Sequence, residues 1–150
     1  MIELEVKVEN KKSFWHHQWL IENFSKQKKG KWIFSDSFYA KPSGYKMCLS
    51  AIMDSNDILY VYFHLVRGES DDKLAWPFKY AVTIDVIHTG NRDICSSKTI
   101  KHSECQLHAG WKKPSNDRSD AIYFLRILVS TDSLAARNDQ LLIKCRVESE

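Results

Sequence analysis

The most regular segment of the chain reads Ile58-Leu59-Tyr60-Val61-Tyr62-Phe63-His64-Leu65-Val66. Its β-branched and aromatic residues favour an extended backbone, and a polar run over residues 67–72 ends it. A membrane-spanning helix needs about 20 apolar residues, so this short segment, which contains a histidine, does not cross a membrane. The segment therefore predicts a β-strand of a globular domain.

Other segments repeat this pattern and are also expected to be strands: Phe14–Leu20, Tyr45–Met53, Tyr80–Ile87, Ala121–Val129 and Gln140–Val147. Turn-forming residues lie between several of them. Two short helices are expected, around Ile21–Gln27 and Thr131–Ala136. Because no long helical segment separates the strands, the sequence predicts an all-β, antiparallel β-sandwich of seven to eight strands.

Composition indicates a single domain and argues against a nucleic-acid-binding protein. The chain has 150 residues, of which 43% are hydrophobic and 27% charged, and its net charge of +3 is too small to indicate a nucleic-acid partner. We expect residues 1–13 to be an N-terminal extension or leading strand and residues 14–150 to form the sandwich. Four cysteines without an export signal predict free thiols and a cytoplasmic protein with no membrane insertion. Two of them, Cys48 and Cys145, are expected to face the core.

Aromatic residues are abundant, with five Trp, six Tyr and seven Phe against five Gly. Large rings fill the space between two sheets efficiently, so most of these residues are expected in the core.

No pattern in the sequence predicts a catalytic or cofactor site. Cys95, His102, Cys105 and His108 offer zinc-type ligands, but their spacing fits no familiar zinc motif, and we expect them in a surface loop without metal. His16 and His17 are neighbours on a strand and should point to opposite faces. The basic run Lys26–Lys31 lacks an aromatic platform for bases and is expected to be a solvated loop. We expect no enzyme and no cofactor.

Five ordered motifs carry a resemblance to a known family: Trp19–Phe24, Phe34–Tyr39 with Gly44–Leu49, Arg67–Glu69 with Leu74–Phe78, Trp111–Pro114 and Asn138–Cys145. Together they resemble the MATH domains, and in particular the C-terminal domain of the TNF-receptor-associated factors, over residues 14 to 147. The resemblance implies a non-enzymatic signalling adaptor that forms homotrimers. It also implies binding of short, linear peptide motifs from receptor tails or adaptor proteins, as an added strand at a sheet edge. A substrate-recruiting MATH module of a ubiquitin ligase is the alternative.

The resemblance also implies where the peptide would bind. The edge strand corresponds to residues near Asp120 and Ala121, and Ala121 stands where the family has a Tyr or Cys. Tyr62 and Trp111 stand where the family has pocket phenylalanines, so an apolar cleft is expected to be retained.

Other positions depart from the family pattern. His108, Ala109 and Gly110 occupy the place of three serines that grip a polar residue of the peptide. Ser50 replaces an arginine and Ile52 a tyrosine. Loss of the arginine removes a charge-assisted contact, so we expect a more apolar peptide preference. The alternative is an inactive groove on a retained scaffold.

Overall fold

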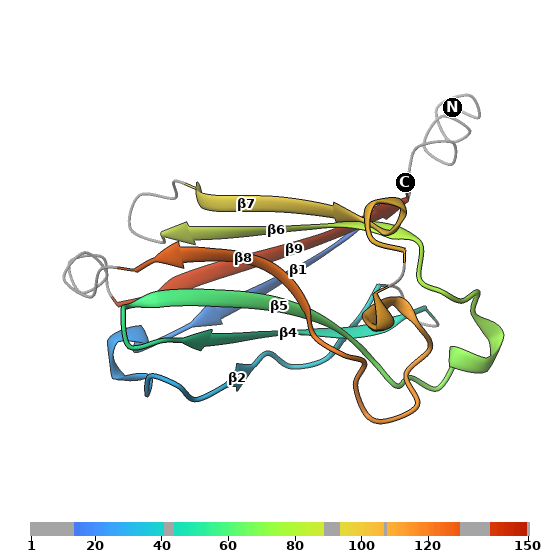
Figure 1. Ribbon diagram of the computed structural model, residues 1–150, viewed down its shortest axis with the longest axis horizontal. Helices are drawn as coiled ribbons and strands as arrows, with labels where there is room; N and C mark the ends of the chain where they lie inside the picture. The colour runs from blue at the N-terminus through green and yellow to red at the C-terminus, as the bar shows by residue number, and fades with distance from the viewer. Residues whose placement is uncertain (1–13, 41–43, 89–93, 107, 130–138, 150) are drawn as a thin grey trace, which may run out of the picture.

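The fold is a β-sandwich of two antiparallel sheets, as expected (Figure 1). The computed structural model describes residues 14–40, 44–88, 94–106, 108–129 and 139–149. The expected extension over residues 1–13 and the expected helix over residues 131–136 lie outside the described residues. Within them, helical backbone is confined to four short 3₁₀ turns: η1 (Phe24–Lys26), η2 (Asp71–Lys73), η3 (His102–Glu104) and η4 (Ala109–Trp111).

Each sheet is built from strands that are distant in sequence. The first sheet has the order β1 (Phe14–Ile21), β9 (Leu141–Ser149), β6 (Tyr80–His88) and β7 (Ile94–Lys101). The second has the order β2 (Ile33–Phe34), β4 (Lys46–Met53), β5 (Ile58–Val66) and β8 (Ile122–Leu128), and β3 (Phe38–Tyr39) also pairs with β4. The short strands β2 and β3 have no counterpart among the strands expected from the sequence.

Alternation along β5 separates a core face from an outer face. Leu59, Val61 and Phe63 are at most 1% exposed and pack between the sheets. Tyr60 and Tyr62 alternate with them on the outer face and remain half-buried. The central strand of the second sheet therefore carries large side chains on both faces, and only one face is covered by the other sheet.

β8 contains one residue more than the partner strand opposite it. Val61 pairs with Leu125, whereas the next residue, Tyr62, pairs with Tyr123, so Phe124 is extra. This β-bulge breaks the alternation of β8, because Phe124 and Leu125 are both buried although they are adjacent.

The structure corrects three expectations. The segment containing Cys95 is strand β7, not a surface loop. β7 is an edge strand whose residues 97–99 are exposed, so it carries few apolar residues, and hydrophobic alternation did not reveal it. The expected helix Ile21–Gln27 is only a 3₁₀ turn that follows Asn23, which has a left-handed φ of 51°. Cys48 is buried on the outer face, because its neighbours Met47 and Leu49 occupy the core face.

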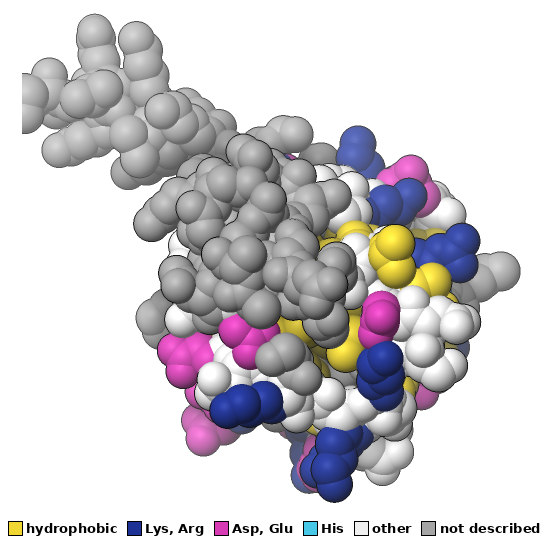
Figure 2. Space-filling view, turned by 90° about the vertical axis from the view of Figure 1, so that its left-hand side faces the viewer, with side chains coloured by type: hydrophobic (Ala, Val, Ile, Leu, Met, Phe, Trp, Pro, Cys, Tyr) yellow, Lys and Arg dark blue, Asp and Glu magenta, His cyan; other side chains and the backbone are white. Residues whose placement is uncertain are grey.

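Two expectations about surface segments are confirmed. Residues 15–21 of β1 alternate in exposure, so that His16 is exposed while His17 stacks on Phe38 at 3.8 Å between ring centroids. The basic run is exposed, and Lys29 pairs with Asp57 at 2.6 Å. Figure 2 shows Lys and Arg side chains interspersed with Asp and Glu at one end of the sandwich, without a continuous basic patch among the described side chains in view.

The described residues include no helix that is long and apolar enough to cross a membrane.

Candidate binding surface

β8 is an edge strand. It pairs with β5 on one side and with no other strand in the described part of the chain. β7 of the other sheet packs nearby but forms no ladder with it. An edge strand presents main-chain N–H and C=O groups that a further extended segment can pair with. The predicted site residues Asp120 and Ala121 directly precede β8, and Asp120 is exposed while Ala121 is half-buried.

A row of aromatic side chains crosses the outer face of the sheet next to this edge. We call it the aromatic row; it comprises Trp32, Phe34, Tyr60, Tyr62 and Tyr123. The ring centroids of Trp32 and Tyr62 are 5.0 Å apart, and those of Tyr62 and Tyr123 are 5.7 Å apart. Trp32, Phe34 and Tyr123 are 42%, 43% and 45% exposed. Contiguous exposed apolar surface of this kind is a candidate interaction site.

Ser50 lies beneath the aromatic row and is inaccessible. In the strand register it lies between Phe34 of β2 and Tyr62 of β5, and it is 0% exposed. Because its side chain is small, the rings of Trp32 and Phe34 reach across β4 to Tyr62 and His64 of β5. The hydroxyl of Ser50 and Nε2 of His64 are 2.6 Å apart. This pair resembles a nucleophile and its base, but no substrate can reach a serine that is fully covered.

The tripeptide expected to replace the family's serines begins turn η4, with His108 as the N-cap and Ala109 and Gly110 as its first two residues. Its members differ in exposure: His108 is half-buried, Ala109 is exposed and Gly110 is buried. The backbone N–H of Gly110 donates to Nδ1 of His108 at 2.8 Å, so this donor is already used within the turn.

Trp111 is part of the core. It is 0% exposed, and its ring stacks on Phe78 at 5.8 Å with an angle of 5° between the planes. Its indole N–H donates to the carbonyl of Cys105 at 3.1 Å. Trp111 therefore supports the surface from below and contributes no exposed area to it.

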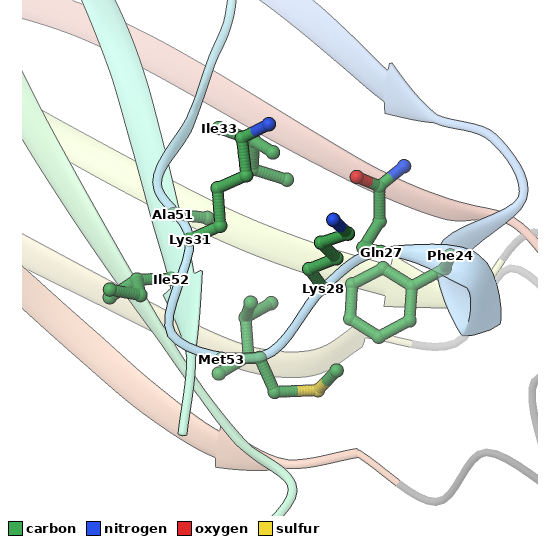
Figure 3. Close-up of a pocket in the computed structure, with 9 residues that line it drawn as sticks. Phe24, Gln27, Lys28, Lys31, Ile33, Ala51, Ile52 and Met53 are labelled. Atoms are coloured by element: carbon green, nitrogen blue, oxygen red, sulfur yellow. The ribbon is translucent and has the colours of Figure 1, made fainter. Parts of the chain in front are cut away.

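Two hollows adjoin the predicted residues. A cavity of about 200 Å³ next to the start of β8 is lined by Ala109, Asp120, Lys112, Lys113 and Arg118, among others. Ile52 lines a separate pocket of only about 10 Å³, together with Phe24 and Met53 (Figure 3). Ile52 pairs with Tyr60 in the β4–β5 ladder and is half-buried. The structure thus brings Ala109 and Asp120 together at one cavity and leaves Ile52 at another.

Arg118 is a residue that sequence reasoning missed. It precedes β8, bridges to Val66, and holds its guanidinium carbon 4.0 Å from the ring centroid of Phe34. The guanidinium also lies close to Cys48. Burial raises the pKa of that thiol, and the positive charge of Arg118 opposes the rise. The available signal was an arginine in the turn before the proposed edge strand.

His64 is held neutral beneath this surface. Burial lowers its pKa below the ordinary value of 6.5, and the positive charge of Arg118 acts in the same direction against a hydrogen bond with the carbonyl of Ser119.

The zinc-type residues whose side chains the structure describes do not assemble into a metal site. In the part of the chain that the structure describes, no three His, Cys, Asp or Glu side chains form a group that could hold a metal ion. Cys105 accepts a hydrogen bond from the indole of Trp111, and His102 meets the same ring edge-on. The side chain of Cys95 lies outside the described residues.

Comparisons with known proteins agree with this architecture. A family model described as "MATH domain" matches residues 16–147. TNF receptor-associated factor 5 of Homo sapiens is 28% identical over 127 residues, which cover 77% of this chain and 22% of that protein. TNF receptor-associated factor 1 of Homo sapiens is 28% identical over 128 residues, covering 78% of this chain and 30% of that protein. The chain therefore spans less than a third of the length of these relatives.

A solved structure has the same fold. The structure of TRAF5 from Notothenia coriiceps superimposes with a TM-score of 0.73 and 21% sequence identity, covering 90% of this chain and 73% of that chain.

Proposed function

Because the chain belongs to the MATH domain family, we propose that it is a signalling adaptor domain that binds short extended peptides from receptor tails or other adaptors. MATH domains are protein-interaction modules and are not catalytic. The observation that carries the proposal is the open edge of β8 beside the exposed aromatic row.

The peptide binds as an additional strand along β8. Main-chain hydrogen bonds to the free edge supply affinity that does not depend on sequence, and side-chain contacts supply selectivity. Tyr62 and Tyr123 form the apolar contact surface next to the edge. Asp120 and Ala121 flank the first part of the peptide, because they lead directly into β8.

The remaining predicted residues fall into two groups by exposure. His108, Ala109 and Ile52 reach the surface and contact the ends of the peptide. Ser50, Gly110 and Trp111 are buried and act by holding the surface in shape.

The test is a screen of phage-displayed random peptides, followed by affinity measurements with the enriched peptides. We expect Tyr62→Ala and Tyr123→Ala to weaken binding at least tenfold, since each removes a large contact ring. The control is His16→Ala, because His16 is an exposed ring on β1 of the other sheet. Equal binding by all variants, with the fold intact by circular dichroism, would rule out this surface.

A second measurement tests the strand-addition mode itself. N-methylation of alternate amides of an enriched peptide removes the donors that face β8 without changing the side chains. We expect one set of alternate positions to abolish binding and the other to leave it unchanged, because successive amides of a strand point in opposite directions. If neither set matters, the peptide does not bind as a strand.

Assembly and location complete the proposal. We infer a cytoplasmic protein that forms homotrimers, by likeness to the TNF receptor-associated factors. Light scattering at several protein concentrations would reveal a trimer, and a constant monomer mass would contradict it.

A further inference from the structure

Arg118 carries an exposed positive charge next to the aromatic row. Its guanidinium lies over Phe34, which is itself 43% exposed, and close to Cys48 on the neighbouring strand β4. In the strand register Phe34 pairs with Ser50, two residues after Cys48. The guanidinium therefore lies over β4, although Arg118 belongs to the turn before β8.

No carboxylate neutralises this charge within the described residues, although acidic groups are close in sequence. Asp117, the adjacent residue, pairs with Arg67 at 3.1 Å. Asp72 pairs with Lys113, a neighbour of Arg118 at the cavity. Asp117 and Asp72 are thus used by other cations, and Asp120 forms no ion pair with Arg118. The neighbours of the guanidinium are therefore a ring and a thiol.

Two contacts hold the guanidinium in position before any partner arrives. Stacking on an aromatic face is favourable for a guanidinium, and the planar group keeps donors free at its edge for a carboxylate. A charge that is already positioned loses less conformational entropy on binding than a free side chain does. His64 below it is neutral at neutral pH, because burial lowers its pKa, and so it adds no second charge.

We propose that Arg118 binds a carboxylate of the docked peptide, so that the recognised segment carries an Asp or Glu next to the residue that packs on the aromatic row. The inference rests on the proposed peptide-binding function and names the chemistry of its partner. It changes the expectation of a purely apolar preference, which followed from Ser50 alone.

The charges around the neighbouring cavity favour the same partner. Lys112, Lys113 and Arg118 line it, against the single carboxylate of Asp120. An acidic segment that follows β8 would therefore enter a region with an excess of positive charge, which also accelerates its encounter with the domain.

The experiment uses the same random-peptide screen with the whole chain and with Arg118→Gln. Glutamine retains length and hydrogen-bonding capacity but lacks the charge. We expect the wild type to enrich Asp or Glu at one fixed position of the motif, and Arg118→Gln to lose that enrichment. For one enriched acidic peptide, replacing its Glu by Gln should weaken binding to the wild type about tenfold and to Arg118→Gln less than about twofold.

Two charge-matched controls separate a local contact from a general effect of net charge. Arg146→Gln removes an exposed charge of the other sheet, and Arg126→Gln removes one from β8 itself. We expect both to retain the acidic preference. If Arg126→Gln or Arg146→Gln abolishes it as fully as Arg118→Gln does, the assignment to Arg118 is wrong.

The outcomes distinguish this inference from the proposed function. Peptides that bind along β8 without an acidic preference, or with one that Arg118→Gln leaves unchanged, overturn the role of Arg118 and leave the peptide site standing. A screen in which the folded wild type enriches no peptide overturns both.

Discussion

Two groups of aromatic rings lie on opposite faces of the second sheet, with similar spacing but different exposure. In the inner group, Phe78 and Trp111 stack at 5.8 Å and both are 0% exposed. In the aromatic row, Tyr62 and Tyr123 are 5.7 Å apart, and Tyr123 is 45% exposed. Ring spacing alone therefore does not distinguish a core from a binding surface. The inner rings have already gained the free energy of leaving water, whereas the outer rings retain apolar area that a partner can bury.

The largest effect should come from removing an inner ring. Trp111→Ala should lower the free energy of unfolding by about 3–5 kcal/mol, because it leaves a cavity between the sheets. Trp32→Ala removes the same side chain from the aromatic row and should cost less than about 1 kcal/mol, since Trp32 is 42% exposed. Urea denaturation measures both. Equal losses would contradict the distinction between the two groups.

A second prediction concerns Gly110, which precedes the buried Trp111 and packs against the start of β8. A Cβ added to Gly110 would lie 2.5 Å from Cγ1 of Ile122 and 2.7 Å from the carbonyl oxygen of Asp120. Gly110→Ala should therefore cost about 1–3 kcal/mol and displace the start of β8, since backbone has to move. Urea denaturation and amide chemical shifts of Asp120 and Ile122 would report this. The exposed neighbour provides the control: Ala109→Ser should leave both unchanged.

A smaller difference should separate the hydroxyls of the two groups. The hydroxyl of Tyr45, in the inner group, donates to the carbonyl of Ala75. Tyr45→Phe leaves that carbonyl without its donor and should cost about 1 kcal/mol. Tyr123→Phe should change stability by less than about 0.5 kcal/mol, because an exposed hydroxyl is hydrated in both states. Thermal denaturation of the two variants side by side would test the pair.

The smallest expected effect is a dependence on pH beneath the aromatic row. His64 has a pKa lowered by burial, so the unfolded chain binds the proton more readily than the folded one. Its contribution to stability is therefore complete above pH 6.5 and is lost as the pH falls toward the lowered value. Chemical denaturation between about pH 7 and pH 5 should show a smaller loss in His64→Gln than in the wild type. An identical loss in both would show that folding does not lower the pKa of His64.

Strand alternation was sufficient to predict the fold from the sequence. Ile58–Val66 is a strand with the expected bounds, and Phe14–Leu20 is one residue short of β1. β7 was missed, because an edge strand with an exposed face needs little apolar sequence. The short strand β2 was also missed, since two residues carry no periodicity.

The binding surface was less predictable, for a physical reason. Alternation assigns Ser50 to the outer face, but it does not show that the neighbouring aromatic rings, including Phe34 of β2, cover that position. Trp111 lies in a 3₁₀ turn, where no period indicates which side is buried. Arg118 acts across two strands through a contact with Phe34 that no sequence pattern encodes.

The β-bulge in β8 limits the length of the peptide segment that can pair with this strand. A regular added strand alternates without interruption, whereas β8 presents Tyr123 outward and then buries two adjacent residues, Phe124 and Leu125. The alternation of the partner's side chains can therefore match that of β8 on only one side of the bulge. A recognition motif for this domain would be confined to a few consecutive residues, and a longer match would require a partner that is itself kinked at the corresponding position.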